Sequence, residues 1–266
     1  MNLLARELKC NLKSLIIWCL AMSFLIYAGM IKYSAFAKTG EAINSFMSSI
    51  PDTMRSVFGI TTNMDLTSVG VFYSIFFLYF LLLASVHSAM LGALILAKEE
   101  RDKTADFLFV KPLTRKYIIS IKILAAFINI LAFDVVTYMI SIISVANYNT
   151  GKSLNYSIFL VVVALFIIQL LFLGLGLLLG AVAKNSKTAT SIISAVILGV
   201  FVLKVIIDLQ DKLKYLEIFS PFEYFKSDIV MFDHQINLPY TVFSFFLVIL
   251  CTGLTYYFFG KRDLKN

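Results

Sequence analysis

The residues that could do chemistry in this chain are few, and their spacing excludes the common catalytic and metal-binding patterns. The two histidines, His87 and His234, lie far apart in the sequence, and neither belongs to H-E-x-x-H or another metal-binding spacing. Gly260-Lys261 is followed by Arg262 rather than Ser or Thr, so it is not a Walker A motif, and no G-x-S-x-G motif occurs. The three cysteines, an odd number, form neither a disulfide framework nor a zinc spacing. We therefore expect no catalytic residue, metal or cofactor in this chain, and a separate subunit if ATP is used.

Asp134 is the polar residue that most needs an explanation, because it lies near the middle of a long apolar segment. A carboxylate at mid-depth in a bilayer costs roughly 2.5–3.5 kcal/mol, so it requires a compensating environment. One interpretation places Asp134 beside a transport route or a polar partner. The other gives it a structural hydrogen bond to a Ser, Thr or Tyr of a neighbouring helix. His87, in another apolar segment, is expected to pack against a polar neighbour.

Two further patterns lie within apolar segments. The residues Phe72, Phe76, Tyr79 and Leu83 follow one another on one helix face and could face a substrate, or pack against helices or lipid. Together with Asp134 they are the candidate substrate pathway. Gly176-x-x-x-Gly180 matches the small-residue motif that lets membrane helices approach closely.

Composition indicates the class of protein that must position these residues. The 266-residue chain is 60% hydrophobic and 15% charged, whereas a soluble domain is about 45–50% apolar and about 25% charged. Water could not solvate that much apolar surface, so we expect a membrane protein. The net charge of +7 does not indicate a nucleic-acid partner, because the basic residues cluster at the ends of apolar segments on alternate loops.

Six segments are long enough to cross a bilayer as helices, which takes about 20 apolar residues each. We expect one all-α membrane domain over residues 1–266, with spans at about 15–31, 70–97, 117–146, 156–183, 189–207 and 240–260. The first is expected to be a retained helix rather than a cleaved signal, because Trp18, Phe24 and Tyr27 interrupt its apolar core. One side of this arrangement carries 15 Lys and Arg residues and the other 8. The richer side, which includes both termini, is expected to be cytoplasmic.

Short helices are predicted outside the spans. Leu4, Leu8 and Leu12 recur every four residues, which suits an interfacial helix over residues 1–14, although leucines could recur so by chance. In the first external loop, Pro51 and Gly59 suit the start and end of a short helix.

The last external loop carries a helix signal of its own. Ser220-Pro221-Phe222-Glu223 has the pattern of a capping box. The aromatic and aliphatic residues that follow at helical spacing are Phe222, Phe225, Ile229 and Phe232. We expect an amphipathic helix pressed against the outer membrane boundary or tucked into the bundle.

The densest charge lies between the second and third spans, in KEERDKTADFLFVKPLTRK over residues 98–116. This segment has helix-forming residues, an apolar cluster at 107–110, and a helix-breaking Lys111-Pro112. It predicts a short amphipathic helix that ends abruptly. A charged loop that only meets water and lipid headgroups is the alternative.

The chain resembles the membrane subunits of ABC-2 type transporters, particularly compact bacterial exporters of antibiotics and peptides. The most specific part is KEERDKTADFLFVKPLTRKYIISIKI, with its Glu pair, a Thr a few residues later, an apolar pair and Pro-x-x-Arg. The segments from Pro51 to Gly59 and from Ser220 to Phe225 are also similar to the family. One departure is Asp102-Lys103 before Thr104, where glycine is frequent in the family.

The resemblance implies that residues 98–116 form a coupling helix docked in a cleft of a cytoplasmic ATPase subunit, which binds ATP and Mg. The resemblance further implies that Glu99 and Glu100 pair with basic residues of the ATPase and that Phe107 and Leu108 fill its groove. Arg115 and Lys116 would then hold lipid phosphates. The candidate coupling residues are Glu99, Glu100, Thr104, Phe107, Leu108, Lys111, Pro112 and Arg115. A second permease copy is implied, with a homodimer favoured over a heterodimer.

The function expected from these observations is that of the permease half of an ABC exporter in the bacterial cytoplasmic membrane. An apolar, aromatic interior favours an amphipathic peptide toxin or antimicrobial peptide, while a lipid or lipophilic drug would suit the same lining. An ion-coupled secondary transporter is less favoured, since only Asp134 is ionisable near a span centre. A membrane enzyme is disfavoured by the lack of a metal or nucleophile pattern.

Overall fold

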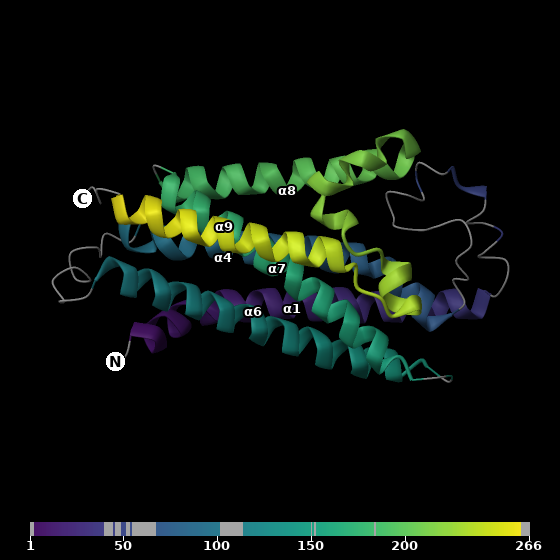
Figure 1. The fold of residues 1–266 in the computed structure, drawn as a ribbon. Helices are drawn as coiled ribbons and strands as arrows, with labels where there is room; N and C mark the ends of the chain where they lie inside the picture. Colours follow the sequence, from purple (N-terminus) through teal and green to yellow (C-terminus); the bar gives the residue numbers. More distant parts are fainter. Residues whose placement is uncertain are drawn as a thin grey trace.

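A computed structural model of the chain describes residues 3–39, 45, 49–51, 54, 68–101, 114–149, 151, 153–183 and 185–261. Six long helices run side by side in a bundle (Figure 1): α1 (Leu3–Thr39), α4 (Val69–Arg101), α6 (Arg115–Ala146), α7 (Asn155–Val182), α8 (Ser186–Leu209) and α9 (Leu238–Lys261). Each is long and apolar enough to span a membrane. Within the described residues there is no strand. The all-α membrane fold with six spans is therefore confirmed.

The helix bounds follow the predicted spans closely, with one exception at the N-terminus. The first span was expected at 15–31, but α1 is one continuous helix from Leu3 to Thr39. Leu4 and Leu8 pack against a buried cluster of the bundle, while Leu12 is exposed. The first residues of α1 therefore contact the other helices directly. A position of residues 1–14 in the membrane interface stays a prediction.

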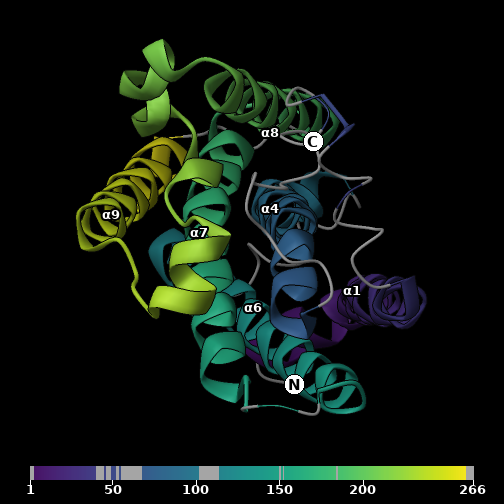
Figure 2. The same cartoon turned by 90° about the vertical axis from the view of Figure 1, so that its right-hand side faces the viewer.

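The core is built on α4 and α7, which lie between the other helices (Figure 2). In each of these two, 67% of the spanning window is buried, against 22% in α1, α8 and α9. Glycines allow their backbones to touch. A Cβ atom at Gly180 would lie 2.8 Å from the Ala93 carbonyl oxygen, and one at Gly92 would lie 2.6 Å from that of Leu173. A Cβ atom at Gly176 would lie closer still to the Ala89 carbonyl oxygen. The close packing predicted from Gly176-x-x-x-Gly180 is confirmed.

The connections gather at the two ends of the bundle. Both chain termini lie at the end where α4 finishes and α6 begins (Figure 1). The opposite end carries the connection from α8 to α9, which contains the 3-10 helices η1 (Asp211–Phe219) and η2 (Pro221–Glu223) and the π-helix η3 (Ile229–Asp233). This arrangement agrees with an even number of spans. The assignment of the terminal end to the cytoplasm stays a prediction.

The two predicted external helices have different outcomes. Most of the segment from Pro51 to Gly59 lies outside the described residues, and what is seen there is a hydrogen bond from Met54 N to Pro51 O at 2.9 Å. Short helices before the last span are present, as expected. The single amphipathic helix predicted over residues 222–232 is wrong, because η2 and η3 are separate turns. Phe222 and Phe225 are tucked into the bundle, whereas Phe232 is exposed.

Candidate functional site

The predicted coupling segment is described only at its two ends. Residues 102–113 lie outside the described part of the chain, and with them the candidates Thr104, Phe107, Leu108, Lys111 and Pro112. Glu99 and Glu100 belong to the last turn of α4, and their side chains are likewise outside the description. The structure therefore shows where α4 ends, at Arg101, and where α6 begins, at Arg115.

The start of α6 is held by local and long-range contacts. The side chain of Thr114 accepts a hydrogen bond from Tyr117 N at 3.3 Å and so caps the helix. Arg115 is exposed, and its Nη1 donates to the Gly260 carbonyl oxygen at 3.2 Å, close to the end of α9. A basic side chain stabilises the free carbonyls and the negative dipole end of a helix. In this structure Arg115 thus links the start of α6 to the end of α9.

A buried ion pair lies close to the same end of the bundle. Lys122 Nζ in α6 donates to the Ile95 carbonyl oxygen of α4 at 2.7 Å and lies 3.6 Å from Glu7 Oε1 of α1. Both charged side chains are almost completely buried. These contacts therefore join α1, α4 and α6 close to the C-terminal end of α4. Neither residue was singled out in the sequence, although a lysine inside an apolar segment was an available signal.

Asp134 faces the inside of the bundle. Its Oδ1 accepts a hydrogen bond of 2.6 Å from Gln169 Nε2 of α7, and its side chain is buried. The partner is an amide, rather than the Ser, Thr or Tyr hydroxyl that the structural interpretation expected. Gln169 itself went unnoticed in the sequence, although a glutamine in the most apolar segment was the signal that could have found it.

His87 of α4 is buried inside the bundle. The His87 ring lies 5.6 Å from the Trp18 ring and 4.7 Å from the Phe133 ring, with the Asn129 side chain beside it. His87 thus has the polar neighbour that was expected.

On the aromatic stripe, Phe72 packs against Tyr33 of α1 at 5.4 Å between ring centroids. Phe76 lies against Gly29 of α1, where an added Cβ would be 2.9 Å from the Phe76 ring. Tyr79 and Leu83 are half-buried. Phe72 and Phe76 therefore pack α4 against α1, and a substrate-facing role for the stripe stays a prediction.

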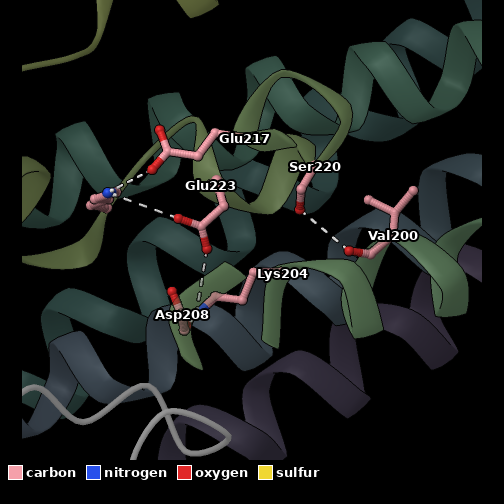
Figure 3. Close-up of polar contacts among 7 residues, drawn as sticks. Val200, Lys204, Asp208, Glu217, Ser220 and Glu223 are labelled. Atoms are coloured by element: carbon pink, nitrogen blue, oxygen red, sulfur yellow. Dashed lines mark hydrogen bonds and ion pairs between the residues drawn. The ribbon is translucent and has the colours of Figure 1, made fainter. Parts of the chain in front are cut away.

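A charged network at the opposite end went unrecognised in the sequence (Figure 3). Lys204 of α8 pairs with Asp208 one turn away and lies 3.8 Å from Glu223 Oε1 in η2. Lys226 lies 3.9 Å from Glu223 Oε2 and 3.4 Å from Glu217 Oε1 of η1. The long lysine stem lets an ammonium near a helix end reach such partners.

This network explains why the predicted capping box is wrong. Ser220 makes no side-chain capping bond, and its Oγ donates instead to the Val200 carbonyl oxygen at 3.3 Å (Figure 3). The Ser220 N–H, from which a capping-box glutamate would accept a hydrogen bond, donates instead to the Glu217 carbonyl oxygen at 3.0 Å, and the Glu223 carboxylate lies between two lysines. Burial, with the nearby Asp208 carboxylate, raises the pKa of Glu223 to about 7.

Packing of aromatic rings, together with the charged network, stabilises the connection between α8 and α9. The rings of Tyr224 and Tyr240 are stacked, with centroids 4.6 Å apart and planes at 4°. Tyr240 OH donates to Glu217 Oε2 at 3.4 Å. The η1–η3 connection is thus held to both flanking spans.

No group of three or more His, Cys, Asp or Glu side chains with the geometry of a metal site occurs in the described part of the chain. No curated protein sequence matches this one significantly. Residues 1–264 match the family described as ABC-2 family transporter protein. With six membrane-spanning helices over nearly the same residues, the match covers the whole bundle. The chain belongs to the ABC-2 family of transporter proteins, the membrane subunits of ABC transporters.

Proposed function

We propose that this chain is the permease subunit of an ATP-driven exporter in the bacterial cytoplasmic membrane. The family match over residues 1–264 carries the proposal. The chain has no Walker A motif, so ATP and Mg are bound by a separate cytoplasmic ATPase subunit. That subunit docks on residues 98–116, and both termini face it.

The contacts at the ends of the coupling segment support this mechanism. The Lys122 contacts to Ile95 and Glu7 join α6 to α4 and α1, and the Arg115 contact joins α6 to α9. A displacement of residues 98–116 by the ATPase therefore acts on α1, α4, α6 and α9 together, because these contacts join them. Such a set of helices moves as a unit, which alternating access between inward- and outward-open states requires.

The substrate class proposed is an amphipathic or hydrophobic compound, with a peptide toxin or antimicrobial peptide favoured over a lipid or drug. Many large apolar side chains are exposed on α1, α6, α8 and α9. The exposed charged side chains of these helices lie toward the helix ends, which leaves few charged groups at mid-span to hold an ionic substrate. Two copies, in a homodimer rather than a heterodimer, enclose the pathway between them.

The experiment that tests the proposal is purification of a tagged copy from its native host, followed by transport in reconstituted vesicles. We expect a co-purifying ATPase subunit and export that stops with vanadate. A complex without any ATPase, together with vanadate-resistant transport, would overturn the proposal. If an ionophore then abolished that transport, an ion-coupled secondary transporter would replace it.

A further inference from the structure

The contact between Asp134 and Gln169 leaves two buried polar atoms without a partner, one on each residue. Gln169 Nε2 donates to Asp134 Oδ1 at 2.6 Å. Asp134 Oδ2 and Gln169 Oε1 are both buried and have no hydrogen-bond partner in the described structure. Buried polar atoms are rarely left unsatisfied, because each costs about 1–3 kcal/mol. Two such atoms on one interacting pair therefore need an explanation.

An ionised Asp134 would leave both of these oxygen atoms without a hydrogen-bond partner. A carboxylate only accepts hydrogen bonds, and so does the amide oxygen of glutamine, so Oδ2 and Oε1 could not satisfy each other. Nor does a lysine, arginine or histidine of the described residues form an ion pair with Asp134; Lys122 lies with Glu7 and the Ile95 carbonyl instead. A charge held at this depth would meet the full cost of burial in the bilayer.

A neutral carboxylic acid satisfies both atoms at once. Its O–H donates to Oε1, while the amide N–H donates to Oδ1 as observed. The result is a ring of two parallel hydrogen bonds between an acid and a primary amide. The opposite orientation of the Gln169 amide leads to the same requirement, because it would set two oxygens 2.6 Å apart with a proton needed between them.

We propose that Asp134 is a proton-binding site, held as a neutral acid that is paired with the Gln169 amide inside the protomer. The site joins α6 to α7, so the bound proton depends on the contact between these helices. The titratable groups that face this region from other helices are Cys19 of α1, which interacts electrostatically with Asp134, and His87 of α4, which packs against Phe133 next to it in the chain. His87 packs against the Trp18 and Phe133 rings with Asn129 beside it, and neither Cys19 nor His87 forms an ion pair with Asp134 in the described structure. The proposal does not rest on export or on an ATPase.

The test is infrared difference spectroscopy on the purified full-length protein at neutral pH, comparing wild type with Asp134→Asn. An asparagine keeps both hydrogen bonds to Gln169, so we expect unchanged folding and loss of one protonated-carboxyl C=O band. Gln169→Leu is the second variant. It leaves the acid without its amide, so the same band should shift in frequency rather than vanish.

Other outcomes would overturn the proposal. Loss of a carboxylate band in Asp134→Asn would mean that Asp134 is ionised in the wild type. A carbonyl band that neither variant alters would mean that the proton is elsewhere. A thermal stability that rises with sodium in the wild type and not in Asp134→Asn would replace the proton by a bound cation between the two oxygens.

Discussion

The ammonium group of Lys122 in α6 lies 3.6 Å from the carboxylate of Glu7 in α1, and both side chains are almost fully buried. The same ammonium donates to the Ile95 carbonyl oxygen of α4. A buried pair of this kind adds little net stability, but loss of one partner costs about 3–5 kcal/mol, because a charge is left in an apolar interior. This gives a direct test of how the three helices are joined.

Glu7→Gln should destabilise the protein strongly, because it removes a negative charge beside a buried ammonium. We expect a loss of about 3 kcal/mol, measured as a fall in thermal stability in detergent. The double variant Glu7→Gln/Lys122→Met is the control and should recover most of the loss. A single variant as stable as wild type would show that Glu7 does not neutralise Lys122.

Gly176→Ala should separate α4 from α7, because the added methyl group would collide with the Ala89 carbonyl. We expect a loss of about 1–3 kcal/mol from overpacking. Gly199→Ala in α8 is the matched control, because no atom lies within 4 Å of its added Cβ. That variant should be neutral or slightly more stable. Equal effects at the two positions would contradict the close approach of α4 and α7.

Glu223 should make stability depend on pH. Its pKa is about 7 in the folded protein, above the value of 4.5 for the free side chain. The folded state therefore binds more protons than the unfolded state between these values, and its stability falls as pH rises from about 4.5 through 7. Glu223→Gln should flatten this part of the curve of melting temperature against pH. A slope that persists in the variant would assign it to other groups.

Phe107→Asp or Leu108→Asp should prevent docking of the ATPase, because a carboxylate would replace an apolar side chain in the proposed groove. The measurement is co-purification of the ATPase subunit with a membrane-inserted permease. Phe107→Leu is the control and should bind as wild type does. Complex formation by the aspartate variants would return residues 98–116 to the alternative of a solvated loop.

Arg115→Ala should act on α6 rather than on docking, because the Arg115 side chain contacts Gly260 at the end of α9. We expect a small loss of thermal stability, on the order of 1 kcal/mol for an exposed hydrogen bond to a charged group. Co-purification of the ATPase should stay normal. A defect in docking with unchanged stability would move Arg115 into the docking surface.

The sequence by itself determined the membrane class, the six spans and the family, because these depend on the length and position of apolar segments and on a near full-length pattern. It also predicted the contact of Gly176 and Gly180 with another helix. What only the tertiary structure decided is which polar residues meet. Glu7 with Lys122, Asp134 with Gln169 and Lys204 with Glu223 are pairs from different elements. The capping box at Ser220 failed for the same reason, since a local pattern cannot reveal that Glu223 lies against Lys204 of another helix.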